Sequence, residues 1–311
     1  MSRGVVPGVV AGYLSVDHSV ALQLGIEPGR TALVGQRLTG EDGRLGGCVS
    51  QIALGLAAER YPVEALSWVG PDRAGSRLID ELSAGGVGVG GIDRQLLDRT
   101  ATTWLCYAPD GLSYCIYDPG GPLPGQLSGE QAALAAGAPW CIVAVGPPEP
   151  TTALLDLLQP AATLVWAVKA DPLSFIPPLA ERLAAASHVI LWSETEASFL
   201  AGVLGEDWRT HCRRPGTLLV ETRGADGCVY IDDDGLHIVE ATARVPVHDP
   251  TGAGDRFAAG LFTALLRGEP TEAAVRAGEA VAASFLARRA REEEVARTSV
   301  HDSGRSTSGI R

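Results

Sequence analysis

The sequence contains a single lysine, Lys169, among its 25 basic residues. This scarcity excludes mechanisms that need a lysine in a fixed motif, including the GxxxxGK[ST] phosphate loop and the strand lysine of protein kinases. The 37 acidic residues give a formal net charge of −12, and no run of basic residues offsets them. Because an acidic surface repels phosphate backbones and anionic lipid headgroups, we expect neither nucleic acid nor a membrane as a partner.

Patterns that form metal sites and disulfide frameworks are also lacking. The six cysteines form no CxxC pair, and the six histidines show neither HxH nor HExxH spacing. In a chain of this length the cysteines are better interpreted as reduced thiols, although Cys106 and Cys115 could face each other across a hairpin. We therefore expect no zinc site built from protein ligands.

Signals for export or membrane insertion are missing from the sequence as well. Residues 1–10 lack a charged region followed by a long apolar run, and no 18 apolar residues follow one another without charge, Pro or Gly. These absences predict a cytoplasmic location. With 46% hydrophobic and 20% charged residues among 311, the chain has the composition of one large globular domain with a substantial core.

Strand and helix patterns alternate along most of the chain. The expected strands cover residues 5–16, 65–70, 140–145, 163–168, 188–191 and 217–221. The expected helices cover residues 46–58, 72–84, 151–158, 176–186, 194–204, 253–267 and 271–290. This α/β alternation predicts a doubly wound, mainly parallel sheet flanked by helices.

Three regions depart from this alternation. Residues 102–107 and 113–117 flank the turn Asp110-Gly111 and predict a hairpin, which together with residues 32–45 would form a small second sheet. Residues 229–231 and 236–239 predict another hairpin around an acidic turn. From Arg291 onward the chain is polar, so we expect a frayed tail over residues 291–311.

The most informative motif is Asp-Pro-Thr-Gly-Ala-Gly-Asp-Arg-Phe at residues 249–257, which leads directly into a helix pattern. The backbone N–H groups of Gly252, Ala253 and Gly254 would lie at a helix start, where unpaired donors and the helix dipole favour an anion. Such a loop can hold phosphate without a lysine. A carboxylate at Asp255, beside that anion, is costly unless it accepts a proton from an attacking hydroxyl. The competing interpretation is a glycine-rich turn whose acids cap the helix.

This motif resembles the second signature of the ribokinase-like, or PfkB, carbohydrate and nucleoside kinases, and the resemblance covers about residues 5–290. It implies a kinase domain over residues 1–290, with a β-sheet lid from about 14–45 and 98–120. Gly46-Gly47 and the helix after them look like the first signature of that family, and residues 69–75 resemble its Val-Gly-x-Asp-x-x-Gly.

The resemblance also implies roles for individual residues. Asp255 would be the catalytic base, and the backbone of Gly252, Ala253 and Gly254 would be the anion hole. Asp17, at the end of the first expected strand, would bind a substrate hydroxyl together with Gly46, Gly47 and Gln51. The residues implied for the nucleotide are Ser193, Thr222, Gly224, Gly227 and Thr251, and Glu196 would lie near Mg²⁺ and the phosphates of ATP.

Each of these roles has a simpler structural alternative. Asp17 could only end a strand as a turn residue. Glu196 could be an exposed acid near a helix N-terminus, and Gly224 and Gly227 could only form a tight connection. Against the turn interpretation of Asp17, the carboxyl ends of parallel strands form the crevice where such sheets bind ligands.

Four residues depart from the family pattern. Gln51 and Ser193 stand where many members carry Asn, Arg256 follows the base where small residues are commoner, and Glu279 replaces an Asn that often borders the purine. Gln51 would shift the bound hydroxyl. Arg256 could point to solvent or bring charge to a phosphate.

We therefore expect a Mg²⁺-dependent kinase that transfers the γ-phosphoryl group of ATP to a hydroxyl of a sugar, inositol or nucleoside. The lid would exclude water from the site. The alternative is a catalytically silent family member that binds a sugar or nucleotide as a sensor or scaffold, which the departures at Gln51, Ser193 and Glu279 favour and the intact Asp255 opposes. An exposed lid sheet could also form a homodimer through its free edge.

Overall fold

The computed structural model describes residues 6–241 and 244–305, with side chains described up to residue 293. Its main element is a nine-stranded sheet whose strands from β12 to β6 run parallel, with two antiparallel strands added at one edge. In spatial order these strands are β14 (Gly235–Val239), β13 (Cys228–Asp232), β12 (Leu218–Thr222), β11 (Val189–Ser193), β10 (Thr163–Ala167), β9 (Trp140–Val143), β1 (Gly8–Ala11), β5 (Val63–Trp68) and β6 (Ile92–Asp93). The expected α/β fold with a mainly parallel sheet is confirmed.

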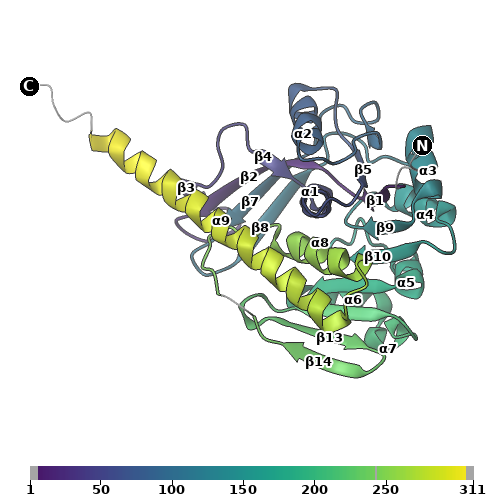
Figure 1. Cartoon of the computed structure of the whole chain (residues 1–311). Coiled ribbons are helices and arrows are strands. Elements are labelled where there is room, and N and C mark those ends of the chain that lie inside the picture. Colours follow the sequence, from purple (N-terminus) through teal and green to yellow (C-terminus); the bar gives the residue numbers. More distant parts are fainter. Residues whose placement is uncertain (1–5, 242–243, 306–311) are drawn as a thin grey trace, which may run out of the picture.

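Helices cover both faces of this sheet (Figure 1). The first face carries α1 (Cys48–Ala58), α2 (Arg73–Ala84), α8 (Ala253–Leu266) and α9 (Thr271–Arg305). The second face carries α3 (Gly129–Gly137), α4 (Pro148–Leu157), α5 (Pro177–Ala186), α6 (Ala197–Leu204) and α7 (Trp208–Cys212). Side chains alternate along each strand between these two hydrophobic cores, so the parallel strands are buried on both sides. The helices α3 and α7 and the short strand β6 were not expected from the sequence.

A smaller sheet packs beside the large one and has the order β3-β2-β7-β8. Its strands are β2 (Ser15–Leu22), β3 (Val34–Arg37), β7 (Thr102–Tyr107) and β8 (Ser113–Asp118), with β4 (Arg44–Gly46) paired to β2. The predicted hairpin is the β7–β8 pair, and the predicted second sheet is present. This sheet is less buried than the large one, because only one of its faces turns toward the body of the protein.

The first expected strand, over residues 5–16, is wrong in its extent. Within the described residues β1 ends at Ala11, the chain bends at Gly12, and β2 starts in the other sheet at Ser15. Asp17 therefore lies inside a strand of the smaller sheet and not at the carboxyl end of a strand of the large sheet. Val5 lies outside the described residues.

The polar segment after Ala290 continues α9 to Arg305 instead of fraying at Arg291. Its Arg, Glu and Ala residues have high intrinsic helix propensity, which lets the helix extend beyond its packed part. The buried carboxylate of Glu293 also accepts hydrogen bonds from the backbone N–H groups of His248 (3.1 Å) and Asp249 (3.0 Å). The end of the expected tail, residues 306–311, lies outside the described residues.

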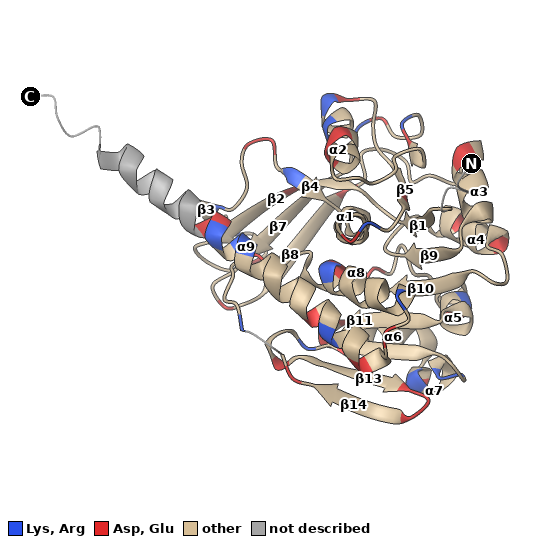
Figure 2. Cartoon of the chain, in the orientation of Figure 1, with Lys and Arg blue, Asp and Glu red and all other residues tan. Residues whose placement is uncertain are grey.

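Acidic and basic side chains are interspersed along the elements and do not separate into blocks of one sign (Figure 2). Among the described residues, no helix combines the length and the hydropathy that crossing a membrane would require. All six cysteines are free thiols, including Cys106 and Cys115 on the hairpin.

Candidate active site

A cavity of about 780 Å³ lies between the smaller sheet and the carboxyl ends of strands β10, β11 and β12. Most of the predicted site residues line it, although they come from segments more than 200 residues apart. These are Asp17, Gly47, Gln51, Ser193, Glu196, Thr222, Gly224, Thr251, Gly252, Gly254 and Asp255. Of the predicted residues, all of which are described, Gly46, Ala253 and Gly227 do not line the cavity.

The loop before α8 has the geometry of an anion-binding turn. Gly252 is the N-cap of α8 and has φ 93°, a left-handed conformation that an L side chain rarely adopts. Ala253 N–H donates to the carbonyl of Pro250 at 3.1 Å, whereas Gly254 and Asp255 are first-turn residues without an intrahelical acceptor for their N–H groups. The donors available to an anion are therefore those of Gly252, Gly254 and Asp255, and the positive end of the helix dipole adds to them.

Asp255 lies in the first turn of α8 and is 6% exposed, facing the cavity. The partly buried thiol of Cys48, at the start of α1, lies close to it, and burial together with the Asp255 charge raises the pKa of that thiol. The Asp255 carboxylate thus lies beside the N-terminus of α8 and lines the cavity.

Asp17 forms the opposite wall of the cavity. Its carboxylate is buried at 5% exposure and accepts a hydrogen bond from Ser15 Oγ at 2.7 Å. Burial raises its pKa, against the lowering effects of Ser15 and Arg44. A Cβ atom at Gly46 would lie 2.0 Å from Asp17 Oδ1, so Gly46 provides the space for this carboxylate without lining the cavity itself.

The structure corrects the expectation for Arg256. Its guanidinium points neither to solvent nor into the cavity but donates two hydrogen bonds to Gln51 Oε1, at 3.2 and 3.1 Å, and stacks over Phe285. Burial and the neighbouring arginines Arg288 and Arg289 lower its pKa to about 10. The Gln51 oxygen is therefore occupied by Arg256, and the Gln51 amide nitrogen donates to the carbonyl oxygen of Leu45 at 3.4 Å and to Ser50 Oγ at 3.3 Å.

Glu196 is buried at 8% exposure, so it is not the exposed helix charge of the alternative interpretation. Its Oε2 accepts the backbone N–H of Ser193 at 2.7 Å, and the two residues form a capping box at the short 3₁₀ turn η1 (Glu194–Glu196). Ser193 Oγ shares a hydrogen bond with Thr195 Oγ1 at 2.9 Å. Glu196 Oε1 faces the cavity.

Thr222 and Gly224 lie at the end of β12 and at the start of the 3₁₀ turn η2 (Gly224–Asp226), where both line the cavity. Gly227 faces away from it, because a Cβ atom there would lie 2.1 Å from the carbonyl oxygen of Val239. Its position fits the structural alternative, a tight connection between β12 and β13.

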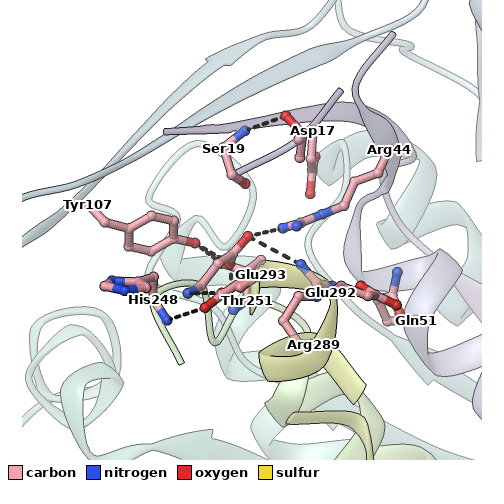
Figure 3. Close-up of polar contacts among 12 residues, drawn as sticks. Asp17, Ser19, Arg44, Gln51, Tyr107, His248, Thr251, Arg289, Glu292 and Glu293 are labelled. Carbon is pink, nitrogen blue, oxygen red and sulfur yellow. Dashed lines mark hydrogen bonds and ion pairs between the residues drawn. The ribbon is translucent and has the colours of Figure 1, made fainter. Parts of the chain in front are cut away.

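Sequence reasoning missed a cluster of charged residues around Asp249, which has no exposed surface. We call this the Asp249 cluster; its members are Arg44, Tyr107, Asp249, Arg289 and Glu293 (Figure 3). The Asp249 carboxylate binds Arg44 from β4, Tyr107 from β7 and, at 3.2 Å, Arg289 from α9. It also accepts the N–H of Thr251 at 3.0 Å.

The Asp249 cluster joins the smaller sheet, the anion loop and α9. Thr251 Oγ1 shares a hydrogen bond with Tyr107 at 2.6 Å, so the hydroxyl predicted to bind nucleotide is already engaged by the smaller sheet. Burial alone would raise the pKa of Asp249, but Arg44, Tyr107 and Arg289 outweigh it and hold the pKa below its ordinary value. Asp249, the first residue of the motif, therefore has a structural role, and its side-chain partners are remote in sequence.

The sequence also gave no sign that Lys169 belongs to the site. It follows β10, lines the cavity, and its Nζ lies 3.8 Å from Glu196 Oε1. The Asp255 charge, with contributions from Cys48 and Glu196, holds the pKa of Lys169 well above its ordinary value despite the opposing effect of burial. The one lysine of the chain thus faces the predicted base.

The donor set does not form a metal cage by itself. Among the described residues there is no group of three or more His, Cys, Asp or Glu side chains arranged to hold a metal ion. Mg²⁺ commonly binds proteins through one or two carboxylates together with substrate phosphates and water. The carboxylate of Glu196, which lines the cavity, fits such a partial site.

The chain is similar to known proteins in sequence and in fold. A model described as pfkB family carbohydrate kinase matches residues 43–292. A ribokinase from Haemophilus influenzae is 22% identical over 298 residues, which cover 92% of this chain and 94% of that enzyme. A nucleoside kinase from Methanothermobacter thermautotrophicus is 40% identical over 90 residues, only 29% of this chain and 26% of that enzyme. The structure of Arabidopsis thaliana ribokinase complexed with ribose and ATP superposes with a TM-score of 0.70 at 20% identity, over 89% of this chain and 91% of that one.

Proposed function

The chain belongs to the pfkB family of carbohydrate kinases, and on that premise we propose that it transfers the γ-phosphoryl group of ATP to a hydroxyl group of a sugar, an inositol or a nucleoside. The observation that carries this proposal is the position of Asp255. A buried carboxylate lies in the first turn of α8, beside unpaired N–H donors and across the cavity from Asp17.

Each residue has a defined part in the proposed reaction. Asp17 and Gln51, which both line the cavity, orient the acceptor, and its hydroxyl gives its proton to Asp255 as the oxygen attacks the γ-phosphorus. A new O–P bond forms while the bond from that phosphorus to the β,γ-bridging oxygen breaks, so ADP leaves with the electron pair. The N–H groups of Gly252, Gly254 and Asp255 bind the phosphoryl oxygens as charge develops on them.

ATP would extend from Thr222 and Gly224, at the end of β12, to the anion loop at Gly254. Glu196 would hold Mg²⁺ from the β11 side. The ion neutralises phosphate charge when bound. The capping role of Glu196 Oε2 leaves Oε1 for this contact and fixes its direction.

One feature of the acceptor end favours a nucleoside over a bare sugar. Tyr13 and Tyr117 both line the cavity and pack against each other with ring centroids 5.3 Å apart, and Leu105 and Cys115 line the cavity as well. Flat aromatic and apolar surfaces suit a nucleobase, whereas a sugar needs mainly polar partners. The local similarity to a nucleoside kinase supports the same preference.

The experiment that tests the proposal is a coupled ADP-release assay with Mg²⁺ and ATP across pentoses, hexoses, inositols and nucleosides. We expect turnover with at least one acceptor, and higher kcat/KM for nucleosides than for the free sugars. Tight ligand binding without any turnover would instead identify a silent sensor.

Replacing the proposed base gives the complementary test. We expect Asp255→Asn to lower kcat by about 1,000-fold or more, because it removes the proton acceptor while keeping the size of the side chain. ADP affinity, measured by calorimetry, should change less than about threefold. Near-full activity of this variant would refute the assignment of the base.

The smaller sheet also supports a dimer. Trp104 and Ile116 are paired across β7 and β8 and are 40% and 54% exposed, on the face away from the cavity, and β8 is an edge strand. Exposed apolar strands with a free edge favour pairing with a second chain. We propose a homodimer through this sheet, which light scattering after gel filtration tests directly.

A further inference from the structure

The position of Lys169 in the sheet places it between the two halves of the cavity. Strands β11 and β12 end at the residues proposed for the nucleotide, and β9 and β1 lie toward Tyr13 and the smaller sheet. Lys169 follows β10, the strand between them. Its Nζ is 3.8 Å from Glu196 Oε1 and 4.0 Å from the position that a Cβ atom would take at Gly254. It therefore points to the place where nucleotide and acceptor would meet.

Among the cationic side chains that line the cavity, Lys169 has the longest distance to its nearest carboxylate. Four cationic side chains line the cavity within the described chain. Arg44 and Arg289 bind the Asp249 carboxylate, and Arg223 binds Glu221 at 2.8 Å. Lys169 lies 3.8 Å from its nearest acid, and 38% of its side chain is exposed. Because the Lys169 ammonium is this far from Glu196, it can move from that carboxylate to a phosphate oxygen with little loss of interaction energy.

The negative charge of the site requires a nearby cation, and Lys169 can supply it. Asp255 and Glu196 place two carboxylates beside the anion loop, and a nucleoside triphosphate would bring further negative charge. The N–H groups of the loop supply only partial positive charge. A full positive charge at Lys169 Nζ offsets this repulsion, and a lysine acts on phosphate as a compact point charge.

We propose that Lys169 is a catalytic residue that contacts the γ-phosphoryl group of the nucleotide and stabilises it during transfer. This inference rests on the proposed kinase function. In the step itself Lys169 donates hydrogen bonds to non-bridging γ-oxygens and keeps all its protons; the acceptor proton goes to Asp255, and the bridging oxygen leaves on ADP. Lys169 thus complements the anion loop from the opposite side of the phosphorus.

The first test compares Lys169→Met with Lys169→Arg and with Arg182→Met, a control that removes one exposed positive charge far from the cavity. We expect Lys169→Met to lower kcat by about 100-fold or more, as removal of one donor to a transferring group does. Its affinity for the Mg²⁺ complex of the non-hydrolysable analogue AMPPCP should fall by about tenfold or more, with ADP affinity nearly unchanged. Lys169→Arg should recover part of the AMPPCP affinity, and Arg182→Met should behave as the wild type.

The second test needs no variant, because the chain has one lysine. An amine-directed acylating reagent, followed by peptide mass spectrometry, reports the reactivity of Lys169 separately from that of the N-terminal amine. We expect the Mg²⁺ complex of AMPPCP to slow acylation of Lys169 about tenfold or more, and ADP to slow it much less.

These results separate the two proposals. A wild-type protein without turnover on any acceptor would refute the kinase assignment, while binding and acylation would still decide whether Lys169 meets the terminal phosphate. Equal effects of AMPPCP and ADP on acylation, or equal losses of affinity for both in Lys169→Met, would refute the role of Lys169. Unchanged kcat in that variant would refute it as well.

Discussion

Asp17 and Asp249 are two buried aspartates near the same arginine, yet their surroundings have opposite effects. Asp249 has no exposed surface, and its carboxylate is bound by two arginines, a tyrosine and a backbone N–H group. Asp17 is 5% exposed, and its carboxylate has hydroxyl donors in Ser15, at 2.7 Å, and Thr103. The pKa of Asp249 is lowered and that of Asp17 is raised.

The difference separates a carboxylate that holds the fold together from one that is kept for a ligand. In the Asp249 cluster the partners compensate the cost of burial, so the ionised form stabilises the native structure. At Asp17 burial dominates, and the carboxylate retains lone pairs that face the cavity. The same contrast holds between the tightly bound arginines of the cluster and Lys169.

Breaking the Asp249 cluster should have the largest effect on stability. We expect Asp249→Asn to lower the free energy of unfolding by about 3–5 kcal/mol, because it leaves the partly buried Arg44 and the buried Arg289 without a compensating carboxylate. Urea denaturation at pH 7 measures this loss. The matched control is Asp226→Asn, which removes an exposed ion pair with Arg244 and should change stability by less than about 1 kcal/mol. Equal effects of the two substitutions would contradict the structural role of Asp249.

Substitution at Asp17 should affect function more than stability. We expect Asp17→Asn to lower kcat/KM for the acceptor by about 10- to 100-fold, because a charged hydrogen-bond acceptor is lost, while ADP affinity is retained. At pH 7 the free energy of unfolding should rise above that of the wild type, since the buried carboxylate is disfavoured there. A clear loss of stability would show that Asp17 is held by partners as Asp249 is.

The pH dependence of stability should distinguish the two aspartates by sign. The folded pKa of Asp249 is lowered, so its contribution is complete above the ordinary value of about 3.9 and is lost as the pH falls through the folded pKa. The folded pKa of Asp17 is raised, so stability falls as the pH rises from the ordinary value to the folded one. In urea titrations from pH 3 to pH 8, the deficit of Asp249→Asn and the gain of Asp17→Asn should both shrink in acid. A deficit or gain that stays constant with pH would contradict the corresponding assignment.

The sequence pattern predicted the parallel strands and most of the helices, because periodicity and turn residues are local. It also predicted that the glycine-rich turn of residues 252–254 opens a helix, and α8 does start there. It failed for Asp17, since an apolar run does not reveal that Gly12 turns the chain from one sheet into the other. It failed for Arg256 because the partner Gln51 is 205 residues away.

By itself, the sequence determined the order of elements, the motif at residues 249–257 and the kind of chemistry that such a motif can support, because these depend on neighbours along the chain. Only the tertiary structure decided what each charge does. It paired Arg44 and Arg289 with Asp249, left Asp17 open to the cavity, and brought the lone lysine to within reach of the anion loop. The energy of a buried charge is set by whichever groups surround it in space, and those groups come from segments that periodicity does not relate.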